Sequence, residues 1–142
     1  MKTALAPAFR PLAAALLLAL APLGARAQAT ADETFAQIEQ AIRNADAPAL
    51  ARHFKPTVEV TIEDADQDYA KNQAQFVIKE FFVNYPVRAF SIVHKGVSGD
   101  THYAVCTYES TRGAFDTNIF LKKQGGAFLV EHIRFERDSS GR

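Results

Sequence analysis

The sequence predicts an α+β domain in which N-terminal helices pack on one face of a curved, mostly antiparallel sheet. Two observations predict this class. Apolar residues recur with helical periodicity in residues 30–54 and 71–85, whereas residues 87–136 have the composition of four consecutive strands separated by glycine-containing turns. Helices that precede a run of antiparallel strands are typical of domains whose helices cover one side of the sheet.

Residues 1–27 have the features of a cleaved export signal. A basic start precedes the apolar run Leu12–Leu23, and residues 25–27 (ARA) place alanines where a signal peptidase cleaves. The run is shorter than the roughly 20 residues that span a bilayer, and no cysteine directly follows it for a lipid anchor. We expect a periplasmic or secreted protein without membrane insertion, and a single domain over residues 28–142. A retained anchor is the alternative.

Two helices are predicted to begin the domain. Thr30 and Glu33 have the spacing of a capping box, which marks the start of the first helix. Apolar side chains recur on one face of this helix: Phe35, Ile38 and Ile42. Asp46 and Pro48 are residue types that begin helices, so they predict a second, short helix that ends before Pro56.

One strand and a third helix are predicted next. Residues 57–63 alternate apolar and polar side chains, as a half-buried strand does. The acidic residues 64–68 are predicted to form a solvated turn. Residues 71–85 carry a wide apolar stripe and end before Pro86, which predicts a helix. The stripe consists of Ala74, Val77, Ile78, Phe81 and Phe82.

Four strands are predicted to complete the domain: Val87–Lys95, His102–Ser110, Ala114–Lys123 and Ala127–Glu136. If their side chains alternate strictly, apolar residues fall on both faces of the last strand, with Val130 on one face and Ile133 and Phe135 on the other. A single layer of helices would cover only one of these faces. The other face is therefore a predicted homodimer interface.

Composition argues against several classes of protein. The full chain has 16 basic and 16 acidic residues, and loss of residues 1–27 leaves it weakly acidic. Without a basic stripe, we expect no binding to nucleic acid. Cys106 is the only cysteine, so the chain has no internal disulfide. We interpret Cys106 as a small buried side chain, with a reactive or intermolecular thiol as the alternative.

We expect neither a metal nor a cofactor. Asp64, Asp66 and Asp68 have the spacing that starts a calcium loop, but Tyr69 and Gln75 stand where that loop needs glycine and glutamate. The four histidines also lack close ligand spacing: His53, His94, His102 and His132. The sequence contains no phosphate-binding, dinucleotide or serine-nucleophile motif.

Four segments resemble a known superfamily. They are VEVTI, KEFF before Pro86, FSIVHKG and the closing FLVEHIRFE. With the order of elements, they resemble the cone-shaped fold of the nuclear-transport-factor-two-like, or SnoaL-like, superfamily, and more narrowly a family of small exported bacterial proteins of unknown function. The resemblance implies helices that close over a curved sheet around a cavity. It implies no activity, because the superfamily contains isomerases, dehydratases, hydrolases and non-catalytic binding domains.

Within that fold, strict alternation places Phe90, Ile92 and His94 on one side of a strand, so we expect His94 at the mouth of the cavity. His94 is the candidate catalytic residue, as a general acid–base. The alternative is a packed histidine with a structural hydrogen bond. The predicted ligand-contacting residues are His94, Tyr69, Phe90, Ile92, Thr107 and Tyr108.

These observations predict an exported, non-catalytic domain. It binds a small apolar or amphipathic ligand in the cavity, or self-associates through the sheet, or does both. One alternative is a cavity enzyme of the isomerase or dehydratase type that uses His94 with a tyrosine. The other is a structural interaction domain whose own aromatic side chains fill the cavity. The sequence identifies neither the ligand, the partner nor the process.

Overall fold

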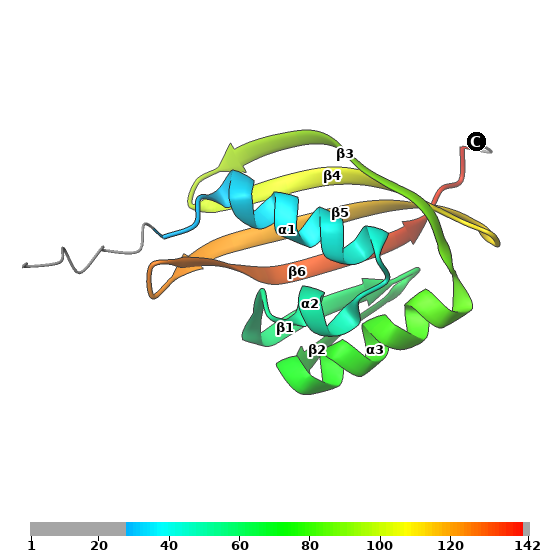
Figure 1. Cartoon of the computed structure of the whole chain (residues 1–142), viewed down its shortest axis with the longest axis horizontal. Coiled ribbons are helices and arrows are strands. Elements are labelled where there is room, and N and C mark those ends of the chain that lie inside the picture. The colour runs from blue at the N-terminus through cyan, green and yellow to red at the C-terminus, as the bar shows by residue number, and fades with distance from the viewer. Residues whose placement is uncertain (1–27, 141–142) are drawn as a thin grey trace, which may run out of the picture.

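A computed structural model describes residues 28–140 (Figure 1). The predicted export signal lies outside these residues. The helices and strands follow in this order: α1 (Ala31–Arg43), α2 (Ala47–Ala51), β1 (Phe54–Ile62), β2 (Ala65–Ala70), α3 (Lys71–Asn84), β3 (Val87–Ser98), β4 (Thr101–Ser110), β5 (Gly113–Gln124) and β6 (Ala127–Arg137). Within residues 28–140, no helix combines the length and the apolar composition needed to cross a membrane.

The strands form one six-stranded sheet in the order β2-β1-β6-β5-β4-β3. β1 and β6 run parallel, and the other neighbouring pairs run antiparallel. Figure 1 shows the helices gathered on one side of the curved sheet, with α1 in front of the long strands and α2 and α3 near β1 and β2. The predicted α+β class, with N-terminal helices on a curved, mostly antiparallel sheet, is confirmed.

The predicted starts of the first two helices are confirmed by their caps. The Thr30 hydroxyl accepts a hydrogen bond from the Glu33 backbone N–H at 3.1 Å, and the Glu33 carboxylate accepts one from the Thr30 N–H at 3.3 Å. Asp46 caps α2 by accepting from the Ala49 N–H at 3.0 Å. Between the two helices, Ala45 adopts a left-handed backbone with φ of 51°. This conformation ends α1 and turns the chain toward α2.

The acidic stretch that was predicted to be a turn is largely the edge strand β2. Ala65 pairs with Ile62, and the register continues to Ala70 opposite Thr57. Aspartate disfavours strands, so composition indicated a turn. All of β2 except half-buried Tyr69 is exposed. Backbone pairing with β1, rather than burial of side chains, therefore holds β2 in the sheet.

Two of the register shifts in the sheet decide where His94 and His132 point. In β3 the register slips between Ile92 and His94, so Val93 is an extra residue. In β6 it slips between Val130 and His132, so Glu131 is extra. An extra residue reverses the alternation of the side chains that follow it.

The bulge in β6 overturns the prediction that Ile133 and Phe135 lie on the face opposite to Val130. Val130, Ile133 and Phe135 all lie on the helix side and are each 0% exposed. The argument for a homodimer loses this support, and self-association stays a prediction.

Aromatic side chains fill the space between helices and sheet. The Phe81 ring lies 4.3 Å from Phe135, 5.1 Å from Phe115 and 5.3 Å from Tyr108, measured between ring centroids. The buried Tyr108 hydroxyl donates to the Tyr85 carbonyl oxygen at 2.5 Å. Most side chains expected to line a cavity belong to this packed core and are each at most 2% exposed: Phe35, Ile38, Ile42, Ile78, Phe81 and Phe90. The two others, Val77 and Ile92, pack against the core and are partly buried.

Candidate functional site

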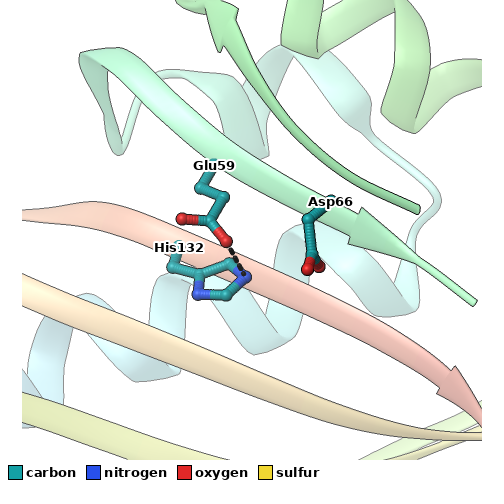
Figure 2. A group of neighbouring side chains, drawn as sticks. All are labelled: Glu59, Asp66 and His132. Carbon is teal, nitrogen blue, oxygen red and sulfur yellow. Dashed lines mark ion pairs between the residues drawn. The ribbon is translucent and has the colours of Figure 1, made fainter. Parts of the chain in front are cut away.

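The side of the sheet that carries no helix, which we name the open face, holds a groove of about 510 Å³. The groove crosses β1, β2, β4, β5 and β6, and its lining is mostly polar: Lys55, Thr57, Glu59, Asp68, Thr101, Phe120, Glu131 and His132. Asp66 lies within 4.8 Å of the Glu59 and His132 side chains, measured between possible ligand atoms. Figure 2 shows Glu59, Asp66 and His132 pointing toward one another.

Sheet register brings these three side chains together. Glu59 of β1 lies opposite His132 of β6 on one side and opposite Asp68 of β2 on the other. Thr61, two residues along β1, lies opposite Asp66. In a regular strand, His132 would face the helices as Val130 does. The extra residue in β6 turns the imidazole to the open face beside Glu59.

A chain of hydrogen bonds fixes the histidine. The Thr61 hydroxyl donates to Asp66 Oδ1 at 2.5 Å and lies 2.8 Å from His132 Nε2. Since the single hydroxyl hydrogen points to Asp66, Nε2 is assigned as the donor in the second contact. Glu59 Oε1 lies 3.4 Å from the same nitrogen. Nδ1 is then the unprotonated nitrogen of the neutral ring.

His132 is held as neutral imidazole at neutral pH. Burial lowers the pKa of His132, and the carboxylate of Glu59 offsets part of that effect. The ring also stacks on Phe120, with 5.5 Å between centroids and 28° between planes. A neutral, oriented imidazole accepts a proton or binds a cation more readily than imidazolium does.

Negative charge collects in the groove. Lys55 and Lys122 both pair with Glu131, at 3.4 Å and 3.7 Å. Among residues 28–140, no lysine or arginine pairs in this way with the three other carboxylates, which belong to Glu59, Asp66 and Asp68. Like charges directly opposite one another in a sheet are destabilising. The carboxylates of Glu59 and Asp68 therefore favour a positively charged ligand.

The predicted position of His94 is wrong. The bulge at Val93 places His94 opposite Val105, on the open face, and not on the face that Phe90 and Ile92 share. His94 is exposed, and its ring lies 5.9 Å from the Tyr103 ring. A catalytic role for His94 stays a prediction that nothing in the structure tests.

The other predicted ligand-contacting residues are not brought together. Phe90 and Tyr108 are buried in the core, and Ile92 packs against it half-buried. Thr107 is exposed on the open face, and the Tyr69 hydroxyl donates to Gln67 at 3.2 Å. The two faces of the sheet separate these residues, so they do not form one site.

Sequence reasoning missed the cluster because its members lie far apart in the chain. Glu59, Asp66 and His132 show no ligand spacing, and only strand pairing makes them neighbours. One signal was available. Glu131 and His132 are two consecutive polar residues between apolar Val130 and Ile133, which is a pattern compatible with a bulge that re-aims a side chain.

A family model described as a domain of unknown function, DUF4783, matches residues 35–136. The chain belongs to the DUF4783 family. A DUF4783 family structure from Bacteroides ovatus is 24% identical, with 74% of this chain and 96% of that chain covered and a TM-score of 0.70. One from Bacteroides uniformis is 19% identical, with 74% and 97% covered and a TM-score of 0.70. No curated protein matches the sequence.

The DUF4783 chain also shares its fold with nuclear-transport-factor-two-like proteins. One of unknown function from Shewanella baltica is 17% identical, with 77% of this chain and 91% of that chain covered and a TM-score of 0.59. The predicted nuclear-transport-factor-two-like, cone-like fold is thereby confirmed. At such identities the likeness shows the fold alone, so function must be argued from the groove.

Proposed function

We propose that the DUF4783 chain is an exported, non-catalytic domain that binds a small, positively charged ligand in the open-face groove. One observation carries the proposal. The carboxylates of Glu59 and Asp66 meet beside His132, and Asp68 lies opposite Glu59 on the neighbouring strand. Among the described residues, none of these three carboxylates pairs with a lysine or arginine. This site replaces the apolar cavity of the sequence prediction, because packed aromatic side chains occupy the interior.

Binding is favoured over catalysis by the hydrogen bonds of the cluster. The Thr61 hydroxyl and His132 Nε2 already bond to each other, and the hydroxyl hydrogen is directed to Asp66. A general acid–base needs its reactive atom within hydrogen-bond reach of the substrate. The Thr61 hydroxyl and His132 Nε2 already have hydrogen-bond partners. They are therefore better suited to orienting a bound ligand than to transferring protons. Export is proposed from the basic start, apolar run and alanine cleavage site of residues 1–27.

Nuclear magnetic resonance tests the proposal. Small amines, carboxylic acids, sugars and inorganic cations are added in turn to the 15N-labelled protein. Positively charged probes are expected to shift the backbone resonances of Phe120, Glu131 and His132, and neutral analogues are not. A Glu59→Gln, Asp68→Asn variant loses these shifts, whereas Asp116→Asn, an exposed carboxylate on β5 outside the groove, keeps them. The proposal fails if no probe shifts the groove resonances, or if the shifts lie elsewhere.

Self-association is a second candidate, with a second copy of this chain as the partner. It is favoured by Val93, which is 60% exposed beside a hollow of about 450 Å³ that Val105 and Thr107 also line. Sedimentation at micromolar concentration tests it. A dimer that Val93→Asp dissociates is expected. Val83→Asp is the matched control, since Val83 is 68% exposed on α3. A monomer at all concentrations would contradict this candidate.

A further inference from the structure

One nitrogen and two carboxylate ligands converge from three neighbouring strands. The possible ligand atoms of Glu59, Asp66 and His132 all lie within 4.8 Å of one another (Figure 2). His132 Nε2 and Glu59 Oε1 are 3.4 Å apart. Around a tetrahedral zinc ion, with ligand bonds of about 2.0–2.1 Å, two ligand atoms lie about 3.3–3.4 Å apart. The histidine and the glutamate already have the separation of two ligands of one ion.

We infer that the cluster of Glu59, Asp66 and His132 binds one divalent transition-metal cation, and that Zn²⁺ fits it best. The inference rests on the proposed function, since it names the class of positively charged ligand. The groove of about 510 Å³ gives the ion access from solvent. Asp68 lies on the same face of β2, two residues from Asp66, and is the candidate for a fourth ligand.

Thr61 orients one of the three ligands, Asp66, and contacts a second, His132. Its side chain is 1% exposed, and its hydroxyl contacts Asp66 Oδ1 at 2.5 Å and His132 Nε2 at 2.8 Å. When Nε2 binds the ion, the hydrogen of the neutral ring lies on Nδ1, and the hydroxyl still donates to the Asp66 carboxylate. Residues that hydrogen-bond to metal ligands without binding the metal themselves fix the orientation of those ligands. Thr61 is thus a positioning residue.

The charges of the groove independently point to a cation. Glu59 and Asp68 lie directly opposite each other on β1 and β2, a pairing that costs stability unless a positive charge lies between them. Lys55 and Lys122 do not supply that charge, since both pair with Glu131. A bound dication would relieve the repulsion between the carboxylates. The unfavourable pair is therefore explained if it serves as part of a metal site.

The donor set selects among metals. Ca²⁺ and Mg²⁺ are bound through oxygen ligands, whereas an imidazole nitrogen beside carboxylates suits zinc and related transition metals. Since the cluster contains His132 and no thiolate, neither a calcium site nor a cysteine-based zinc site is expected. We expect Zn²⁺ to bind and Ca²⁺ and Mg²⁺ not to compete with it.

Calorimetric titration of the purified, chelator-treated protein with zinc chloride tests the inference. The expected result is one Zn²⁺ per chain. His132→Ala lowers the affinity more than about 100-fold, because it removes a ligand, and Thr61→Val lowers it about 10–100-fold, because it removes an orienting partner. His94→Ala is the matched control, since His94 is an exposed histidine on the same open face, and it leaves the affinity unchanged.

Three outcomes would overturn the inference: no heat from zinc, a zinc affinity that survives in His132→Ala, or an equal loss in His94→Ala. Glu59→Gln removes a ligand whose side chain is partly exposed, so this variant is expected to stay folded and to bind zinc more weakly. Thermal melting checks that every variant is folded. If zinc fails but an organic cation still shifts the groove resonances, the metal inference alone falls. If neither binds, the proposed function falls with it.

Discussion

Val130 and Ile133 face the same side of the sheet, although residues three apart in a regular strand face opposite sides. Both are 0% exposed beneath the helices. The extra residue Glu131 makes this possible, and it turns His132 outward in the same step. One bulge thus completes the core and also builds the candidate site.

Deletion of Glu131 is expected to unfold the domain. Without the extra residue, either Val130 or the pair Ile133 and Phe135 must face solvent. A fully buried aliphatic or aromatic side chain contributes roughly 1.5–3 kcal/mol, and a typical domain is stable by only about 5–15 kcal/mol. Circular dichroism and urea melts check this. Glu131→Ala keeps the residue count and is expected to cost less than about 1 kcal/mol. A deletion variant as stable as Glu131→Ala would contradict the assigned role of the bulge.

Replacement of Ala45 by glycine is expected to stabilise the domain. The Ala45 N–H donates to the Ile42 carbonyl oxygen and the Asp46 N–H to that of Ala41, at 2.9 Å and 2.8 Å. This pattern usually has glycine where Ala45 stands with φ of 51°. Relief of a left-handed alanine is worth about 1–2 kcal/mol, and the extra entropy of glycine in the unfolded chain offsets about 0.5–1 kcal/mol. The expected net gain is about 0.5–1 kcal/mol.

Ala36→Gly is the matched control for this gain. Ala36 is exposed inside α1, where glycine costs about 1 kcal/mol relative to alanine. Thermal or urea melts of the two variants are therefore expected to shift in opposite directions. If Ala45→Gly also lowered the free energy of unfolding, the left-handed conformation at this position would be refuted.

Cys106 is expected to be inert in the folded protein. The side chain is 1% exposed on the helix side of β4, and burial raises the pKa of the Cys106 thiol to about 12. Thiolate is the reactive form, and at about pH 8 very little of it exists in the folded state. In the native protein, a thiol-specific disulfide reagent is expected to react with Cys106 only as fast as the domain opens. In denaturant, the same reagent is expected to react with Cys106 rapidly. Rapid reaction of the native protein would support the reactive-thiol alternative instead.

Most elements of the fold were predictable from the sequence because their signals are local. The capping box at Thr30 and Glu33 and the apolar stripe of α3 depend only on residues within a few positions of one another. The strand β2 was missed because its residues are acidic and exposed, and only pairing with β1 defines it. A local sequence pattern does not show which other strand a segment pairs with.

The candidate site was not predictable, because it depends on two features that single-strand periodicity ignores. A bulge moved His94 away from the predicted cavity, and another moved His132 to the open face. Register between β1, β2 and β6 then placed Glu59 and Asp66 beside His132. The interior was also misjudged, since periodicity identifies core-facing residues but does not show whether they leave a void.

Acidification is expected to destabilise the domain partly through His53. Burial lowers the pKa of the half-buried His53 side chain, and the nearby cations of Arg52 and Lys71 lower it further. As pH falls below about 6.5, the unfolded chain binds a proton at His53 before the folded state does, so the free energy of unfolding decreases. Above about pH 7 the residue is neutral in both states and contributes no pH dependence.

The variant His53→Gln isolates this contribution. Urea melts at about pH 7 and about pH 5 are expected to show a smaller loss of stability for His53→Gln than for the wild type, because glutamine binds no proton in either state. His102→Gln serves as the control at a histidine on β4. Burial also lowers the pKa of His132, so part of the acid sensitivity persists in His53→Gln. Equal losses in the wild type and in His53→Gln would show that His53 titrates alike in the folded and unfolded chains.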